Sequence, residues 1–143
     1  MAFLNSLDIS GSALTAQRLR MDIISQNLAN ATTTRTADGG PYRRRAAVFT
    51  AAATDDFATC FSKARHDLGG VVVSRIVTDM SDLRVEYDPE HPDADSEGYV
   101  HYPNVDEVKE LIDMMAATRA YESNITALNA TKNMALKALE IGK

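Results

Sequence analysis

The sequence predicts a mainly α-helical fold, in which a small β module lies between two long terminal helices. Apolar residues recur at helical spacing near both ends of the 143-residue chain, whereas turn residues and short β-branched segments fill the middle. We expect the two helices to form an antiparallel, coiled-coil-like pair. Four segments follow: a helix with its terminus (1–34), a β-rich module (35–87), an acidic, proline-containing linker (88–103) and a second helix (104–143).

The first predicted helix runs from about Ser6 to Asn30. Apolar residues recur every seven positions along it, which is typical of a helix that packs against another helix. Asn5 or Ser6 could cap its start, and Asn30 followed by three threonines marks its end. The residues of this pattern are Leu7, Leu14, Met21 and Leu28, with Ile24 on the adjoining face.

The second predicted helix runs from Val105 to about Ile141. Asn104 precedes it as a candidate cap, and Glu107 would complete an Asn-x-x-Glu capping box. No Pro or Gly interrupts the pattern, which contains two rows of sevens. One row is Leu111, Thr118, Ile125, Lys132 and Leu139, and the other is Met114, Tyr121, Leu128 and Ala135.

The middle of the chain predicts three short β-strands, near residues 43–50, 71–78 and 83–87. Gly69-Gly70 before the second of them suggests a hairpin. Residues 51–68 fit a helix, a loop or partial disorder. Residues 88–104 contain three prolines and five acids, and this composition indicates an extended linker.

Composition excludes several classes of function. A net charge of −5 argues against nucleic-acid binding, and the basic run Arg43-Arg44-Arg45 is better explained as a solvated junction or a partner for local carboxylates. No apolar run is long enough for a membrane span, and no basic segment precedes an apolar one as in a cleavable signal peptide. With aromatic residues at only 6%, we expect a thin core.

Three groups of polar residues were weighed as chemical sites, and each has a simpler explanation. Asp93 to Gly98 imitates the start of a calcium loop, but its twelfth position is Asn104 instead of a bidentate Glu. The single cysteine, Cys60, and His66 lack an orienting partner for catalysis. The remaining histidines lie ten residues apart, without the spacing of a zinc site. We therefore predict no catalytic residue, no metal and no cofactor.

Packing predicts that the terminal helices assemble with other chains. At 1.5 Å per residue they would measure roughly 37 and 55 Å, which is too long for the β module to cover. Neighbouring chains would then bury the remaining apolar faces. The candidate interface residues are Leu7, Leu14, Met21, Ile24, Asn27, Leu28, Ala29, Asn30, Leu111, Met114, Tyr121, Ile125, Leu128 and Leu139.

Four stretches of the chain resemble the flagellar basal-body rod proteins, which belong to the rod and hook axial family. "SQNLANATT" matches the Asn-x-Ala-Asn motif of that family through Asn27, Ala29 and Asn30. The acidic run within "DPEHPDADSEGYVHYPNVDEV" is similar to that of a proximal rod member. "GGPYRRRAAVF" and "MMAATRAYESNITALNATKNMALKALEIGK" extend the similarity over nearly the whole chain. Gln26, Leu28 and Glu90 depart from the usual pattern.

The resemblance implies a structural subunit of the proximal rod, which transmits torque across the periplasm. Its terminal helices would pack in a helical array, with the β module outside. The chain would be exported by the flagellar type III apparatus, and its neighbours would be other rod proteins and the export-gate base. The alternatives are a coiled-coil adaptor or export chaperone, and a small hydrolase built on Cys60 and His66.

The Asn-x-Ala-Asn segment has a structural interpretation of its own. Asn27 and Asn30 can bond backbone groups where the helix ends, and the short side chain of Ala29 allows another helix to approach. We expect this segment to join the helix to the β module and to contact a neighbouring chain. A plain helix stop with no role between subunits is the alternative.

We predict that the terminal helices are only partly formed in a dilute monomer and become ordered on assembly, because packing stabilises most protein helices. Circular dichroism over a dilution series measures this directly. Nearly complete helicity that does not change with concentration would contradict the prediction.

Overall fold

The fold consists of two long helices and two small antiparallel β-hairpins, which confirms the fold class that the sequence predicts. The coordinates are a computed structural model that describes residues 2–37, 39–52 and 69–141. In chain order the elements are α1 (Ala2–Ala29), β1 (Arg45–Ala51), β2 (Val71–Thr78), β3 (Arg84–Tyr87), β4 (Tyr99–Tyr102) and α3 (Glu107–Ile141).

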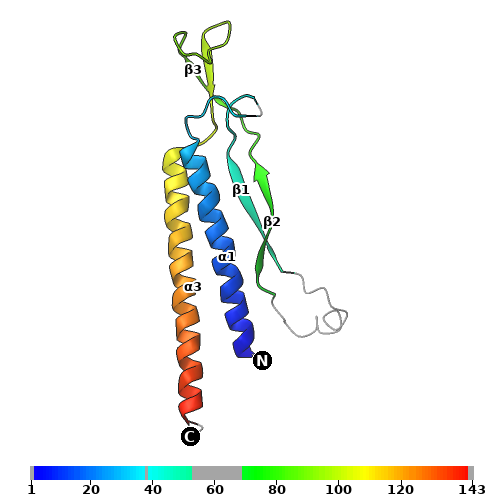
Figure 1. Cartoon of the computed structure of the whole chain (residues 1–143), viewed down its shortest axis with the longest axis vertical. Helices are drawn as coiled ribbons and strands as arrows, with labels where there is room; N and C mark the ends of the chain where they lie inside the picture. Colours follow the sequence, from blue (N-terminus) through cyan, green and yellow to red (C-terminus); the bar gives the residue numbers. More distant parts are fainter. Residues whose placement is uncertain (1, 38, 53–68, 142–143) are drawn as a thin grey trace, which may run out of the picture.

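Helix α1 is the central element, with α3 on one side and the β1–β2 hairpin on the other (Figure 1). The helices run antiparallel, so the two ends of the chain lie at the same end of the molecule. The β3–β4 hairpin projects beyond the opposite end. Because only α1 is covered on two sides, the core is thin, as its composition predicts. Its buried apolar residues are Ala16, Ile23, Ile24, Ala31, Tyr42, Val100, Val105 and Ala117.

Both helices differ from the sequence prediction at their starts. Helix α1 begins at Ala2, so Asn5 and Ser6 lie within it and do not cap it. Helix α3 begins at Glu107, and its cap is Asp106, whose Oδ1 accepts hydrogen bonds from the amides of Val108 at 3.0 Å and Lys109 at 3.2 Å. The predicted cap, Asn104, is occupied elsewhere, as described below.

One of the two predicted rows of α3 faces α1, and the other is exposed, with Thr118 as the member that still reaches Met21 of α1. Met114, Tyr121, Leu128 and Ala135 are half-buried, as expected. The row that begins at Leu111 is exposed. A second row that begins one residue earlier, at Glu110, faces α1 instead. Small or polar side chains in this second row let the helices approach closely. Together the inward rows are Glu110, Met114, Ala117, Tyr121, Asn124, Leu128, Thr131 and Ala135.

The β1–β2 hairpin confirms the predicted pairing of the first two strands. The strands are antiparallel, with Arg45 opposite Thr78 and Ala51 opposite Val71, and a register shift lies between Val48 and Phe49. Residues 53–68 of the segment between the strands, for which the sequence fits a helix, a loop or partial disorder, lie outside the described part of the chain. Ser12 of α1 holds the far end of the hairpin, since its Oγ accepts a hydrogen bond from the amide of Val71 at 3.0 Å.

The segment expected to be an extended linker instead folds into the second hairpin. Residues 99–102 form β4, which pairs with β3 so that Tyr87 lies opposite Tyr99. The Asp95 carboxylate accepts hydrogen bonds from the amides of Glu97 and Tyr99, both at 2.9 Å, and these bonds hold its pKa below the ordinary value. Gly98 has φ of 83°, a conformation that favours glycine.

Replacing Asp106 with Ala should destabilise the protein by about 1 kcal/mol, because the first-turn amides of α3 lose their acceptor. Urea denaturation followed by circular dichroism measures the change. Glu122→Ala, at an exposed position within α3, is the matched control and should change stability by less than about 0.5 kcal/mol. Equal effects of the two substitutions would contradict the assignment of Asp106 as the cap.

Candidate assembly surface and the polar junction behind it

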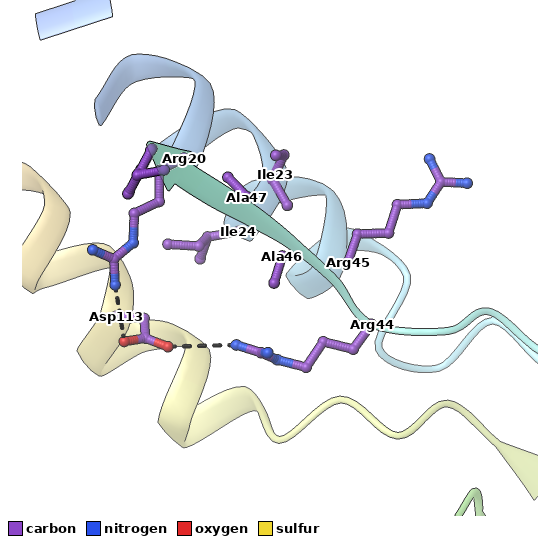
Figure 2. A pocket seen from close by; sticks show the side chains of 9 residues that line it. Arg20, Ile23, Ile24, Arg44, Arg45, Ala46, Ala47 and Asp113 are labelled. Atoms are coloured by element: carbon purple, nitrogen blue, oxygen red, sulfur yellow. Dashed lines mark hydrogen bonds and ion pairs between the residues drawn. The ribbon is translucent and has the colours of Figure 1, made fainter. Parts of the chain in front are cut away.

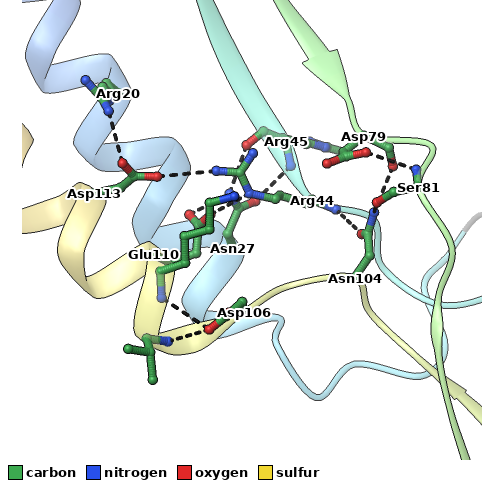
Figure 3. Close-up of polar contacts among 12 residues, drawn as sticks. Arg20, Asn27, Arg44, Arg45, Asp79, Ser81, Asn104, Asp106, Glu110 and Asp113 are labelled. Atoms are coloured by element: carbon green, nitrogen blue, oxygen red, sulfur yellow. Dashed lines mark hydrogen bonds and ion pairs between the residues drawn. The ribbon is translucent and has the colours of Figure 1, made fainter.

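Asn27 lies at the centre of a polar junction where α1, β1 and α3 meet (Figure 3). Its side chain is fully buried and uses both ends of its amide. Nδ2 donates to the carbonyl of Arg45 at 2.8 Å and to Glu110 at 3.0 Å, whereas Oδ1 accepts from the amide of Arg45 at 3.0 Å. Asn27 thus bonds both the amide and the carbonyl of Arg45, the first residue of β1, as a neighbouring strand would. These bonds fix the end of α1 to the start of β1.

A network of ion pairs fixes the start of α3 to the same point. Glu110 is fully buried, and its Oε1 lies 2.6 Å from Nε of Arg44. The same guanidinium lies 3.5 Å from Asp113, which also pairs with Arg20 of α1 at 3.4 Å. Breaking a buried pair of this kind is costly, since it leaves one charge without a partner.

Tyr42 closes the junction on the side of the loop before β1. Its hydroxyl donates to Oδ1 of Asn27 at 2.9 Å. Burial of the ring raises the pKa of this phenol, an effect that the nearby Arg45 opposes. The hydroxyl therefore keeps its proton at neutral pH and remains a donor to Asn27.

Asn104 extends the junction toward the second hairpin. Its Oδ1 accepts from the amide of Arg44 at 2.9 Å, and its Nδ2 donates to the carbonyl of Asp79 at 3.1 Å and to Ser81 Oγ at 2.8 Å. These bonds explain why Asn104 does not cap α3. The Asp79 carboxylate in turn accepts from the amide of Ser81, which lowers the pKa of Asp79.

The arginine run serves the junction through local partners, as the sequence analysis favoured. Arg44 pairs with the buried Glu110 and the half-buried Asp113. Arg43 donates to the carbonyl of Ser81 at 3.1 Å, and the Arg45 guanidinium lies 5.8 Å from the ring centre of Tyr42. Charge is neutralised within the chain at Arg44, whose side chain is 22% exposed.

A shallow hollow of about 300 Å³ lies beside the junction, between α1 and β1 (Figure 2). Ile23, Ile24 and Phe49 contribute apolar surface to it, and Arg20 and Asp113 lie at its edge. Arg45 points away from it. The ionic groups at this edge already neutralise one another, so the hollow does not present a free set of catalytic groups.

An exposed apolar ridge lies on α3 near the junction and is made by Val108, Leu111, Ile112 and Met115. These four side chains are between 53 and 67% exposed. Helical periodicity places them on the side of α3 away from α1, while Glu110, Met114 and Ala117 face α1. We call this set the α3 ridge.

The structure separates the candidate interface residues into inner and outer groups. Ile24 and Asn27 are buried within the chain, whereas Ala29 is exposed at the end of α1. Met21 contacts α3, since Thr118 Oγ1 lies 3.7 Å from its sulfur. The half-buried residues are Leu7, Leu14, Met21, Leu28, Asn30, Met114, Tyr121 and Leu128, and the exposed residues of α3 are Leu111, Ile125 and Leu139.

Comparison with known proteins identifies the family. The Flagella basal body rod protein family matches residues 7–35, and the Flagellar basal body rod FlgEFG protein C-terminal family matches residues 96–141. The chain is 48% identical to the flagellar basal-body rod protein FlgC of Bacillus subtilis, over all of both chains. It belongs to the FlgC family of flagellar basal-body rod proteins. It is also 44% identical to FlgC of Borreliella burgdorferi, with 99% of this chain and 98% of the relative covered, and 42% identical to FlgC of Escherichia coli over both full chains.

The family matches coincide with the two sides of the polar junction. The first contains Asn27, and the second contains Asn104 and Glu110. Asn30 behaves as the sequence predicts, because its Nδ2 donates to the carbonyl of Gln26 at 2.8 Å where α1 ends. A contact between this segment and a neighbouring chain stays a prediction.

The other chemical candidates have structural partners or lie outside the described residues. Asp93 accepts from Thr34 Oγ1 at 2.8 Å, and Asp95 holds the turn before β4. Within residues 2–37, 39–52 and 69–141, no three potential metal-ligating side chains gather. Cys60 and His66 lie outside these ranges. Neither helix of the described chain has the length and apolar character needed to cross a bilayer.

Sequence reasoning missed Glu110 and underestimated Asn27. The available signal was an acid between Val108 and Leu111, at helical spacing from Met114 and Ala117, in a chain that also contains three consecutive arginines. A buried acid needs a cation, and the arginine run supplies one. Arg44 and Glu110 are 66 residues apart in the sequence, so no local pattern reveals that they pair.

Replacing Asn27 with Leu should destabilise the protein by about 3 kcal/mol, because Tyr42, the Arg45 backbone and Glu110 all lose a buried partner. Urea denaturation measures the loss. Gln26→Leu, at the exposed neighbouring position, makes a similar change of side chain and should cost less than about 0.5 kcal/mol. A variant at Asn27 as stable as the one at Gln26 would show that the junction contributes little.

Proposed function

We propose that this chain is a structural subunit of the flagellar rod that assembles through the apolar faces of its terminal helices. The observation that carries the proposal is the α3 ridge, which neither α1 nor the hairpins cover. Contiguous apolar surface of this kind marks interaction sites in soluble proteins. Its four side chains are large, so a neighbouring helix that covered them would gain substantial hydrophobic stabilisation.

The shape of the helix pair suits a rod. Helices of 28 and 35 residues extend roughly 42 and 52 Å, so they are long and narrow relative to the β module. The polar junction fixes the pair at one end, through Asn27, Arg44 and Glu110. Bundled side by side, such pairs would transmit torque by packing between subunits, and catalysis has no part in this function.

The finer location of the chain is part of the same proposal. We infer a place in the proximal rod, within the periplasm, with other rod proteins and the export-gate base as neighbours. Export through the flagellar type III apparatus fits helices that require assembly for full order. The names of the relatives support the basal-body location, and similarity over the full length of FlgC proteins disfavours the adaptor or chaperone alternative.

Different residues have different roles in the proposed assembly. Leu111 and Ile125 face outward on α3 and would contact neighbouring subunits, together with Ala29 at the end of α1. Met114 and Tyr121 face α1 and would maintain the pair itself. Substitution of an outward residue should therefore affect assembly more than the stability of the monomer.

Replacing both Leu111 and Ile112 with Asp should abolish swimming and leave basal bodies without complete rods, because charge on the α3 ridge cannot be buried between subunits. Motility in soft agar and electron microscopy of purified basal bodies report the result. Urea denaturation of the soluble chain should show a change below about 1 kcal/mol, since these side chains are exposed.

Ala127→Asp is the matched control, because Ala127 is exposed on α3 and helical periodicity places it on a different side of the helix from the ridge. This variant should swim. Normal rods in the doubly substituted strain would contradict the proposed role of the ridge.

A further inference from the structure

The two ends of the molecule carry surfaces of opposite character, beginning with the C-terminal turns of α3. Helix α3 is seven residues longer than α1, and Figure 1 shows it continuing past the start of α1. Leu139 is 72% exposed there, and Met134 and Leu136 are exposed as well. We call residues 132–141, the last turns of α3, the α3 overhang; Ala135 within it still faces α1.

The α3 overhang is basic as well as apolar. Lys132 and Lys137 are exposed, and no acid lies between Glu122 and Glu140. Lys137 pairs with Glu140 at 2.7 Å, but both side chains are more than 60% exposed, so this pair is weak and can exchange partners. The overhang therefore presents leucine and methionine side chains beside lysine.

At the opposite end, one face of the β3–β4 hairpin is open. Alternation along the paired strands places Val85, Tyr87, Tyr99 and His101 on this face. The rings of Tyr87 and Tyr99 meet edge to face with centres 5.3 Å apart, and Tyr87 is 66% exposed. The other face contains Val100, which is fully buried. The set of four is the open hairpin face.

Acidic residues surround the open hairpin face. Residues 82–98 contain seven of the 20 acids of the chain but only one of its 15 bases. Several of these carboxylates, including Glu90 and Glu97, are exposed. A strongly negative field of this kind disfavours an anionic membrane or nucleic acid and favours a basic protein surface.

We propose that the α3 overhang of one copy docks on the open hairpin face of the next copy along the assembly axis. The apolar side chains of the overhang would pack on Tyr87 and Tyr99, and its lysines would approach the surrounding carboxylates. The contact joins different surfaces of identical chains, so it propagates in one direction and does not close into a dimer. It rests on the proposed function and adds an axial contact to the lateral packing through the α3 ridge.

Cross-linking between two differently tagged full-length chains tests this contact. In a Cys60→Ser background, one chain carries Tyr87→Cys and the other carries Leu139→Cys, and a short bis-maleimide joins thiols that lie close together. We expect a mixed cross-linked dimer at least about fivefold more abundant than with Thr50→Cys in place of Tyr87→Cys. Thr50 is exposed on β1, away from the open hairpin face.

Reversing the charges on the two docking surfaces distinguishes specific docking from random collision. Glu90→Lys with Glu97→Lys on the first chain should lower the mixed product roughly fivefold. Adding Lys132→Glu with Lys137→Glu on the second chain should restore most of it. A yield equal to the Thr50→Cys control, or one that these exchanges do not change, would overturn the proposed contact.

Failure of this contact can be told apart from failure of the proposed function. Substituting Leu111 and Ile112 with Asp on both chains should leave the mixed cross-link unchanged, because the α3 ridge is separate from both docking surfaces. If those substitutions abolish rods but no specific cross-link forms, only the axial contact is wrong. If the cross-link forms and rods are normal in the ridge variant, the lateral role of the ridge is wrong.

Discussion

The buried contact between Asn27, Glu110 and Arg44 is the interaction on which the rest of the fold depends. It joins three segments distant in sequence, and among the described elements no strand contacts both terminal helices. Asn27 supplies the Arg45 backbone with partners that a third strand would otherwise provide. Because Glu110 is fully buried, its charge requires both partners in place, so the geometry of the junction is strongly specified.

This arrangement separates stability from assembly. At the junction the chain satisfies its own polar groups, whereas farther along α3 the inward residues become small or polar, as at Ala117, Asn124 and Thr131. Such a seam buries little area per residue, so it stabilises the pair only modestly. Other large apolar side chains, such as Ile112 and Met115, lie on the outside, where neither α1 nor the described hairpins cover them. The chain thus exposes a row of large apolar side chains on α3, while Tyr121 and Leu128 face α1.

Local patterns revealed the helices and the first hairpin, but they could not determine long-range choices. The heptad rows of α3 predicted the pairing of Met114 and Tyr121 with α1, yet whether Glu110 or Leu111 turned inward depended on Arg44, far away in the sequence. Strand β4 was missed because its four residues become a strand only by pairing with β3 across an acidic loop. Asn104 has the sequence features of a helix cap, but its side chain forms hydrogen bonds with Arg44 and Ser81 instead.

Residue-resolved amide hydrogen exchange on the dilute monomer tests most directly whether the junction anchors the helix pair at one end. Protection should be highest for the Arg45 amide and for α3 amides near Ala117, and should fall steadily toward Leu139, where α1 no longer covers α3. Equal protection from Ala117 to Leu139, or rapid exchange of the Arg45 amide, would show that the helices are stable without this anchor.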